Sequence, residues 1–212
     1  SLLALRPELI VAPLEFHRAN VLAKLEELKI PVLLLEATSL EQVFAHIHTL
    51  GRIFDRSTAA HALTAEMRQQ MADISRRTEG LSRTRVLYVI NSQPLITVGP
   101  GSYIHQMIGL AGGINIASGA ATAYPRLTME IVLQENPEIL IFPRGSVETV
   151  PRREQEAWRR WTTLTAVQEN RLREVSAYAL NRPGPRVMQG LEALARVIHP
   201  EAFASESTAA QP

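Results

Sequence analysis

The chain has 212 residues, of which 46% are hydrophobic, a net charge of +1 and no cysteine. The lack of cysteine excludes disulfides, thiolate metal sites and thiol catalysis, and the balanced charge argues against binding to nucleic acid or to an anionic membrane. No apolar run reaches the roughly 18 residues that a membrane-spanning helix needs, so we expect no insertion into a membrane.

The first elements form one β-α-β unit. Short apolar runs at residues 8–12 and 31–35 predict two strands buried on both faces, and helical spacing of apolar residues at 21–28 predicts a helix between them. Such units make parallel sheets with right-handed crossovers.

Two helices follow this unit. Ser39 and Gln42 fit a capping box at the start of a helix that runs to about Gly51. A second helix is predicted from Ser57 to Thr78, and at 1.5 Å per residue it would span roughly 30 Å. Gly80 suits the end of this helix, because a left-handed residue there costs glycine little.

The second half repeats the alternation of strand and helix. We predict strands at residues 85–90, 95–98, 138–142 and 171–175, and a last helix that starts near Val187 and stops before Pro200. Two glycine-rich turns, at 99–102 and 112–113, bracket one short helix, and Thr128 is a candidate N-cap for another.

The predicted fold class is α/β, with two parallel-sheet α/β lobes joined by one long rigid helix and with the first lobe incomplete. Residues 1–56 would form the partial N-terminal lobe, 57–80 the connecting helix, 81–203 the C-terminal lobe and 204–212 a disordered tail. A two-stranded sheet is marginal alone, and the chain starts as if in the tail of a helix. We therefore expect upstream sequence to be missing and self-association through the incomplete lobe to be possible.

A collinear series of short motifs resembles one family, the substrate-binding proteins of ABC importers for vitamin B12, ferric siderophores and haem. The series covers nearly the whole chain, and its members are Leu5-Arg6-Pro7-Glu8-Leu9-Ile10, Leu50-Gly51, Gly99-Pro100-Gly101-Ser102, Ala111-Gly112-Gly113-Ile114-Asn115, Tyr124-Pro125-Arg126-Leu127-Thr128-Met129-Glu130, Asn136-Pro137-Glu138-Ile139, Trp161, Leu164-Thr165-Ala166-Val167, Arg182-Pro183-Gly184-Pro185-Arg186 and His199-Pro200-Glu201.

The resemblance implies a function without catalysis. It implies a periplasmic protein that holds a corrinoid such as cobalamin, or alternatively a ferric siderophore or haem, between two lobes and delivers it to an ABC transporter permease. The metal chelate would be the transported ligand rather than a cofactor. The resemblance also implies a signal peptide upstream of this sequence.

Candidate ligand-binding residues are Tyr124, Ile96, Tyr103, Arg126 and Arg182. In the resemblance, the aromatic at Tyr124 stacks on a flat macrocycle or chelate, although packing in the core is an alternative. Ile96 is a second candidate for the wall of the ligand cleft, with an ordinary core strand residue as the alternative. Tyr103 and His105 lie on the short helix that follows and are candidates to reach the cleft. The arginines are suited to ligand carboxylates, amides or phosphates, or are merely solvated.

Glu130 carries the proposed contact with the permease. In the resemblance, a glutamate at this position meets arginines of the permease, whereas the simpler interpretation is a carboxylate favoured by the helix dipole. The turn at Gly99 resembles a phosphate loop but lacks the lysine and spacing of one, so a tight strand-to-helix turn capped by Ser102 is favoured.

Three other functions are alternatives for this chain. The histidines at 17, 46, 48, 61, 105 and 199 are scattered, so no metal site is predicted. An α/β enzyme would use Glu130, His105 or Glu148 as acid–base groups, but no pair of groups demands it and no catalytic residue is assigned. A scaffold lobe that has lost its ligand is the remaining alternative.

Overall fold

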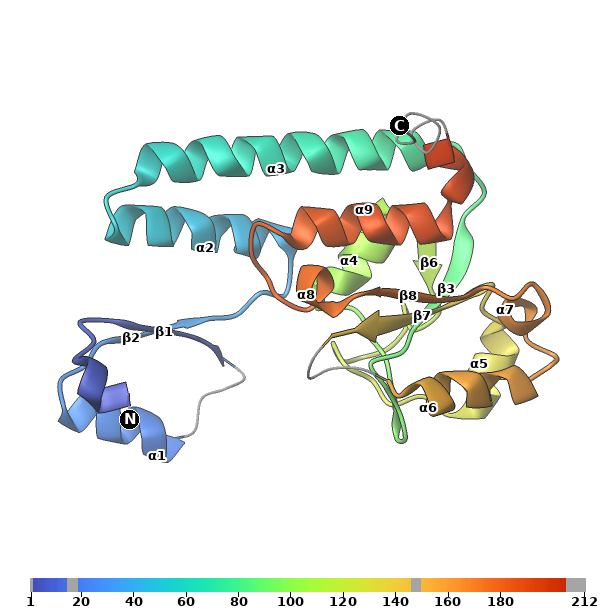
Figure 1. Ribbon diagram of the computed structural model, residues 1–212, viewed down its shortest axis with the longest axis horizontal. Coiled ribbons are helices and arrows are strands. Elements are labelled where there is room, and N and C mark those ends of the chain that lie inside the picture. Colours follow the sequence, from blue (N-terminus) through green and yellow to red (C-terminus); the bar gives the residue numbers. More distant parts are fainter. Residues whose placement is uncertain (1, 15–18, 146–149, 205–212) are drawn as a thin grey trace, which may run out of the picture. The chain divides into compact units, whose positions relative to one another are not determined.

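The computed structural model describes residues 2–14, 19–145 and 150–204, which form two compact units. The first unit covers Ser1–Ala37 and the second Thr38–Pro212. Each unit is described separately below (Figure 1). In the described residues, no helix is both long and apolar enough to cross a membrane.

The first unit is the predicted β-α-β unit. A short 3-10 helix, η1 (Leu2–Leu5), precedes β1 (Ile10–Pro13), α1 (Ala19–Glu27) and β2 (Val32–Leu35). The two strands are parallel and pair Ile10 with Val32, as expected for strands that are connected through a helix. This sheet has only two strands, and every residue of β2 is partly exposed.

The first unit also contains both lysines of the chain. Lys24 lies in α1, where its ammonium group is 3.0 Å from the carboxylate of Glu27, and Lys29 follows the helix at a positive φ of 53°. Both side chains are exposed. All cationic side chains of the second unit are therefore arginines or histidines.

The second unit begins with the helices α2 (Leu40–Ile53) and α3 (Ser57–Thr78), which pack against each other. Ser39 caps α2 as predicted, since its hydroxyl accepts a hydrogen bond from the amide of Gln42. Gln42 reaches back one residue further than a capping box requires, because its side-chain oxygen accepts from the amide and hydroxyl of Thr38.

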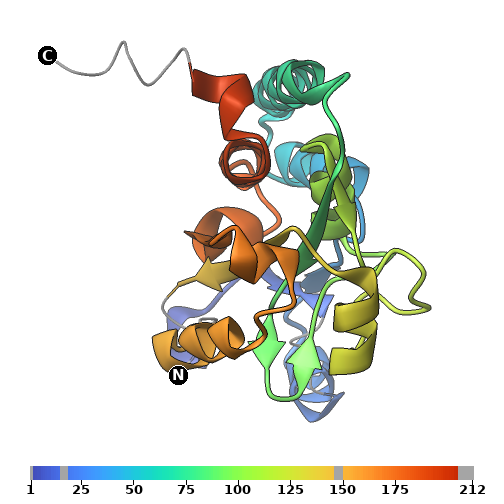
Figure 2. The same cartoon turned by 90° about the vertical axis from the view of Figure 1, so that its right-hand side faces the viewer.

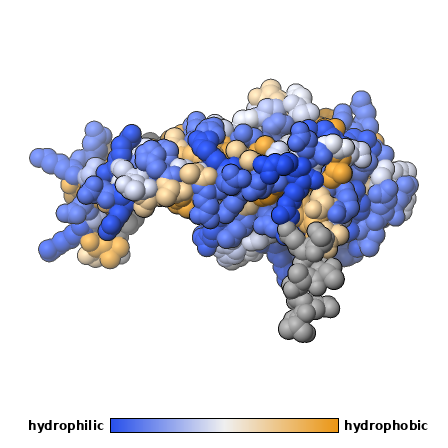
Figure 3. Space-filling model, turned by 90° about the horizontal axis from the view of Figure 1, so that it is seen from above, coloured by the Kyte–Doolittle hydropathy of each residue, from blue (hydrophilic) through white to orange (hydrophobic). Residues whose placement is uncertain are grey.

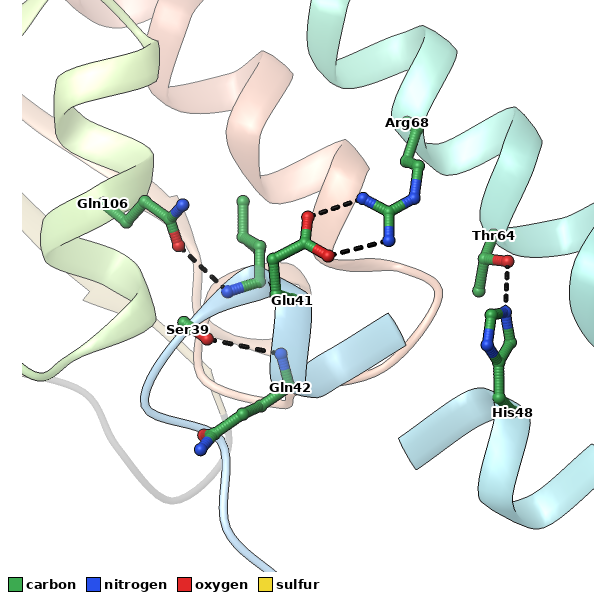
Figure 4. A network of polar contacts seen from close by, with 8 residues as sticks. Ser39, Glu41, Gln42, His48, Thr64, Arg68 and Gln106 are labelled. Atoms are coloured by element: carbon green, nitrogen blue, oxygen red, sulfur yellow. Dashed lines mark hydrogen bonds and ion pairs between the residues drawn. The ribbon is translucent and has the colours of Figure 1, made fainter. Parts of the chain in front are cut away.

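A polar network fixes the start of α2 to its neighbours (Figure 4). The carboxylate of Glu41 forms a two-pronged ion pair with Arg68 of α3, with N–O distances of 2.5 and 2.7 Å. The amide of Leu40 donates to the side-chain oxygen of Gln106, which lies 66 residues further along the chain. Residues 38–42 are therefore tied into the second unit.

The outer face of α3 is polar, as its sequence predicts. Hydrophilic residues predominate on the side of the molecule where α3 lies, with hydrophobic residues visible only in smaller areas (Figure 3). The opposite face of α3 carries the predicted apolar stripe, of which Ala60, Met67 and Ile74 are buried. Gly80 follows the helix at a φ of 79°, which confirms its expected left-handed conformation.

A four-stranded parallel sheet organises the rest of the second unit. Its order is β6 (Gly113–Asn115), β3 (Thr84–Tyr88), β7 (Ile139–Arg144) and β8 (Leu172–Ser176). The strands near 85–90, 138–142 and 171–175 were predicted, but β6 was not. Its Gly113 packs so closely that an added Cβ would lie 2.8 Å from Ile108 and 2.9 Å from Val86.

Helices cover both faces of this sheet (Figures 1 and 2). One face packs against α4 (Tyr103–Leu110), α8 (Ala177–Leu180) and α9 (Val187–Ile198), and α3 packs on α9. The other face is covered by α5 (Met129–Glu135), α6 (Arg152–Ala157), η3 (Trp158–Arg160) and α7 (Thr165–Gln168). The hydrophobic core cluster contains Leu87 of β3 and Leu140 and Phe142 of β7, together with Val132 of α5 and Trp158 of η3.

The predicted strand at residues 95–98 is only partly correct. Leu95–Ile96 (β5) pairs with Asn91–Ser92 (β4) in a two-stranded antiparallel hairpin, and the chain beyond Ile96 leaves the hairpin. A turn containing Gln93 and Pro94 separates the two short strands, so this segment does not join the parallel sheet.

The α/β fold class is confirmed, and the predicted division of the chain stays a prediction. The contacts of α2 and α3 place both helices in the second unit, whereas we expected α2 in a lobe that ends at residue 56. The final 3-10 helix, η4 (Pro200–Phe203), closes the described chain. Residues 205–212 of the expected tail lie outside the described residues.

Candidate functional site

The loops that follow the four parallel strands meet at one edge of the sheet. Parallel α/β sheets bind ligands outside the carboxyl ends of their strands, where successive connections run to opposite sides. Here β3 connects to β6 on one side, and β7 connects to β8 on the other. Tyr124, Arg126 and Arg182 lie in the connections at this edge and Ile96 lies in the short strand β5 that follows β3, so this edge is the candidate site. Glu148 lies outside the described residues.

An irregular antiparallel ladder holds three of these residues. Backbone hydrogen bonds join Leu127 to Leu95 (3.1 Å), Thr97 to Pro125 (3.1 Å) and Gly99 to Ala123 (2.8 Å). Ile96 and Arg126 face each other across this ladder.

The ladder presents Tyr124 and Arg126 to solvent. Tyr124 is 50% exposed, Arg126 is exposed, and Ile96 is partly buried. The residue after Tyr124 is proline, which favours an extended backbone at the tyrosine. The site therefore has an exposed aromatic ring beside a cation and an aliphatic side chain.

The glycine turn at 99–102 is a strand-to-helix turn, as favoured from the sequence. Gly99 approaches the neighbouring segment so closely that an added Cβ would lie 2.4 Å from the carbonyl oxygen of Thr122. Ser102 caps α4, because its hydroxyl accepts from the amide of Ile104. Gly101 adopts a φ of 87°, which glycine tolerates best.

Asn115 ties the second glycine turn to the first. Its amide nitrogen donates to the carbonyl of Val98 at 2.8 Å and lies 2.9 Å from Nδ1 of His105, which therefore accepts. Its amide oxygen accepts from the backbone of Ala117. The buried Asn115 thus sets the conformation of the loops on both sides of β6, and this role was not recognised from the sequence.

Tyr103 lies apart from the exposed candidates. Its side chain is 4% exposed, and its hydroxyl donates to the carbonyl of Leu180 at 2.7 Å. This placement favours a structural role in which Tyr103 holds α4 against α8. Its expected contact with a ligand stays a prediction.

Arg182 lies at the other end of the same sheet edge. Its guanidinium carbon lies 4.8 Å from the ring centroid of Tyr178, whose side chain is 41% exposed. A cation over an aromatic face is attracted to it, so this contact orients the guanidinium. The sequence analysis did not single out Tyr178, because it lies in α8, a helix of four residues that is too short for a helical spacing to be recognised.

Glu130 lies in the first turn of α5. Thr128 caps this helix, and its hydroxyl accepts from the amide of Ile131 at 3.5 Å. A hydrogen bond from the Thr128 side chain, followed by the backbone amide of Glu130, holds the pKa of the Glu130 carboxyl below its usual range. The group is fully exposed, so α5 presents a carboxylate to solvent.

The described histidines lie in different parts of the second unit. In residues 2–14, 19–145 and 150–204, no group of three or more metal-ligating side chains converges. Packing of α2 on α3 does bring two imidazoles together, because the rings of His48 and His61 have centroids 4.4 Å apart and His48 also contacts Thr64 at 2.7 Å (Figure 4). His17 lies outside the described residues.

Two surface hollows lie elsewhere in the second unit. One, of about 530 Å³, is lined by the end of α3 and the Gly109–Gly112 turn, and the other, of about 460 Å³, lies between α3 and α9. Neither includes Tyr124, Ile96 or Arg126.

Known proteins similar to this chain are solute-binding proteins. A vitamin B12-binding protein of Vibrio cholerae is 26% identical over 193 residues, which cover 91% of this chain and 68% of the relative. Two solved structures share the fold and each match 95% of this chain. They are a heme-binding protein of Roseiflexus sp. RS-1 (TM-score 0.82, 20% identity, 79% of that chain) and an Fe3+-hydroxamate transport protein of Saccharomonospora viridis (TM-score 0.73, 26% identity, 70% of that chain).

The family assignment rests on most of the chain. The family model described as "Periplasmic binding protein" matches residues 1–179, which include every strand of both units and all the candidate residues except Arg182. The chain therefore belongs to the periplasmic binding protein family.

Proposed function

We propose that the protein is the substrate-binding component of an ABC importer and that its ligand is a metal chelate. The observation that carries this proposal is the half-exposed Tyr124, held by a hydrogen-bonded backbone ladder at the carboxyl edge of the sheet. The names of the similar proteins support a corrinoid such as vitamin B12, or haem or a ferric siderophore, in this role.

Each candidate residue has a distinct part in the proposed binding. The ring of Tyr124 stacks on the flat face of the chelate, since a tyrosine offers a large contact for little loss of side-chain entropy. Ile96 supplies aliphatic contact beside it, and Arg126 and Arg182 meet polar groups at the rim of the ligand.

Glu130 is the proposed contact with the permease. Its carboxylate is anionic and exposed at the start of a capped helix, so it can accept two hydrogen bonds from one arginine. The proposal also implies that the protein works in the periplasm, because the permease receives its substrate there.

Ligand titration tests the binding role. Cyanocobalamin, haemin and ferric siderophores should be titrated separately, and one of these classes is expected to bind saturably. Tyr124→Ala should weaken that binding about tenfold, because a stacked aromatic ring adds up to about 1.5 kcal/mol beyond area burial. Phe54→Ala is the control, since Phe54 is an exposed aromatic residue at the end of α2 and is distant in sequence from Tyr124. If none of these ligands binds saturably, the proposal fails.

Delivery to the permease needs a separate test. Glu130→Gln should leave ligand affinity unchanged and reduce uptake by the reconstituted importer about tenfold, because it removes a charge from an interfacial pair. Glu135→Gln, at the other end of the same helix, is the matched control. Equal uptake by both variants would rule out the role of Glu130.

A further inference from the structure

The side chain of Asn115 begins a series of hydrogen bonds that reaches the segment of Tyr124. Asn115 is the last residue of β6 and is 3% exposed. Its side-chain nitrogen donates to the carbonyl of Val98 at 2.8 Å, and its side-chain oxygen accepts from the amide of Ala117 at 3.1 Å. A carbonyl can only accept and an amide can only donate, so these two partners determine the orientation of the Asn115 side chain.

One peptide group connects Asn115 to the backbone before Tyr124. The carbonyl of Val98 and the amide of Gly99 belong to the same planar trans peptide and point in opposite directions. The carbonyl accepts from Asn115, and the amide donates to the carbonyl of Ala123 at 2.8 Å. Ala123 directly precedes Tyr124. A change that turns this peptide group therefore alters the backbone that carries the tyrosine.

Burial makes the contact with Asn115 hard to replace. Val98 is fully buried and Ala117 is 4% exposed, so water is largely kept away from both residues. A buried carbonyl that loses its donor raises the free energy of the folded state. Without the Asn115 amide, the Val98 peptide is therefore expected to turn toward another donor and to weaken its bond with Ala123.

The second hydrogen of the Asn115 amide depends on an imidazole. Nδ1 of His105 lies 2.9 Å from the Asn115 nitrogen and accepts from it, so the ring proton is on Nε2. Protonation would turn Nδ1 into a donor, and two donors would then lie opposite each other. Exchanging the positions of the Asn115 nitrogen and oxygen does not relieve this conflict, because the oxygen would then lie against the carbonyl of Val98 and the nitrogen against the amide of Ala117.

Neighbouring elements offer no carboxylate to His105. In the part of the chain that the structure describes, the hydrogen bond with Asn115 is the only polar contact of this ring. The helix α4 packs against β6, which has no ionisable residue, and against α3 and α9. On α9, Glu192 and Arg196 pair with each other at 2.7 Å. The ionisable side chains of α3 all have partners elsewhere, and they are His61, Glu66, Arg68, Asp73, Arg76 and Arg77.

We propose that Asn115 is a positioning residue for ligand binding and that His105 makes this role sensitive to acid. With a neutral imidazole, Asn115 holds the Val98 peptide, and the ladder presents Tyr124 to the face of the chelate. With a protonated imidazole, Asn115 releases Val98 and the ligand is bound more weakly. This inference rests on the proposed function and adds control of the same site by pH.

Hydrogen exchange tests the positioning role without any ligand. In Asn115→Ala, the Gly99 amide should exchange about three- to tenfold faster relative to the amides of β7, because its peptide group has lost one hydrogen bond. Asn136→Ala is the matched control, since Asn136 also joins two segments by side-chain hydrogen bonds, to Thr165, but does so before β7. It should leave the relative exchange of Gly99 unchanged.

Titration connects the positioning role to binding. Cyanocobalamin, haemin and a ferric siderophore serve as probes, and the one that binds the unmodified protein is used for the variants. Asn115→Ala should weaken its binding about three- to tenfold, since the loss corresponds to about one hydrogen bond. Asn136→Ala should leave this affinity unchanged even where it lowers the stability of the fold.

The pH dependence of binding tests the part of His105. The unmodified protein should bind the probe about three- to tenfold more weakly at about pH 5 than at about pH 7.5, the range in which imidazoles gain a proton. In His105→Asn, an amide oxygen takes the place of Nδ1 and does not titrate, so the ratio of the two affinities should fall toward one. His46→Asn, which removes a half-buried histidine of α2, should keep the ratio of the unmodified protein and so accounts for any titration of the probe itself.

The outcomes separate this inference from the proposed function. If a chelate binds but Asn115→Ala binds it as tightly as the unmodified protein, or if His105→Asn keeps the full effect of pH, the inference is wrong and the chelate-binding function stands. If no chelate binds to the unmodified protein, the proposed function fails and with it the role of Asn115 in binding. The exchange of Gly99 then still decides whether Asn115 orders the ladder.

Discussion

Two strands with similar sequences, β2 and β7, are buried to very different extents. Residues 32–35 of β2 are all aliphatic, and so is the start of β7, yet the whole of β2 is partly exposed whereas residues 139–143 of β7 are buried. β7 lies between β3 and β8 and is covered by helices on both faces, whereas β2 pairs only with β1. An apolar run thus predicts a strand, but its burial depends on the neighbours that the rest of the chain supplies.

The largest expected effect compares matched substitutions in these two strands. Leu140→Ala in β7 should lower the free energy of unfolding by about 2–5 kcal/mol, because it removes a fully buried side chain and leaves a cavity. Leu34→Ala in β2 should cost less than half as much, since its side chain is already in partial contact with water.

Urea denaturation of both variants measures these costs. Circular dichroism and a fluorescence probe should be followed together, so that separate unfolding of the two units can be recognised. Equal losses for the two variants would mean that β2 is as well covered in solution as β7. The contrast between the strands would then be wrong.

A smaller effect is expected at Ser39, which caps the first helix of the second unit. Ser39→Ala should lower the stability of that unit by about 1 kcal/mol, because the amide of Gln42 loses its hydrogen-bond acceptor. It should leave the first unit unchanged. Hydrogen exchange of amides in β3 and β1 separates the two responses, and a loss of protection in β1 would show that the units are coupled.

The smallest effect concerns the ion pair between Glu41 and Arg68. The hydrogen bond from Arg68 lowers the pKa of Glu41, so the pair stabilises the fold above the unfolded pKa of about 4.3 and loses that contribution as the pH falls through the lowered folded pKa. Both side chains are substantially exposed, which limits the contribution to about 1 kcal/mol or less.

Thermal denaturation across pH measures this contribution. The unmodified protein should exceed Glu41→Gln in stability at pH 7, and the difference should shrink below about pH 4. A difference that stays constant from pH 7 to pH 3 would contradict an ionic origin.

Local signals in the sequence predicted much of the fold. The predicted N-cap residues Ser39, Ser102 and Thr128 are confirmed, because each hydroxyl accepts a hydrogen bond from a backbone amide two or three residues later. The bounds of α3 agree with its apolar stripe at both ends. These features depend on residues within a few positions of each other.

Features that depend on distant contacts were missed. The three residues of β6 begin with the second glycine of the Gly112–Gly113 pair, which the sequence predicts as a turn, and only their place beside β3 makes them a strand. The helices α6, α7 and α8 have four to six residues, which is too short for a helical period to be recognised.

The candidate site also combines local features, which the sequence predicted, with features that depend on distant contacts, which it did not. Its residue types were predicted, but the pairing of residues 95–99 with 123–127 depends on contacts across nearly thirty residues and was not. Tyr103 was expected beside a ligand because it follows a glycine turn, whereas the structure buries it against Leu180. The side of α4 that faces the core could not be predicted from so short an apolar segment, so the inward direction of the Tyr103 ring was not foreseen.

The confinement of both lysines to the first unit has a practical consequence for spectroscopy. Amine-reactive dyes will attach at Lys24 and Lys29 and find no lysine in the second unit. The chain has no cysteine, so a single cysteine introduced on the exposed face of α3 can carry a different dye. Energy transfer between the two dyes would then report the distance between the units before and after ligand is added, and the introduced cysteine is the only substitution needed.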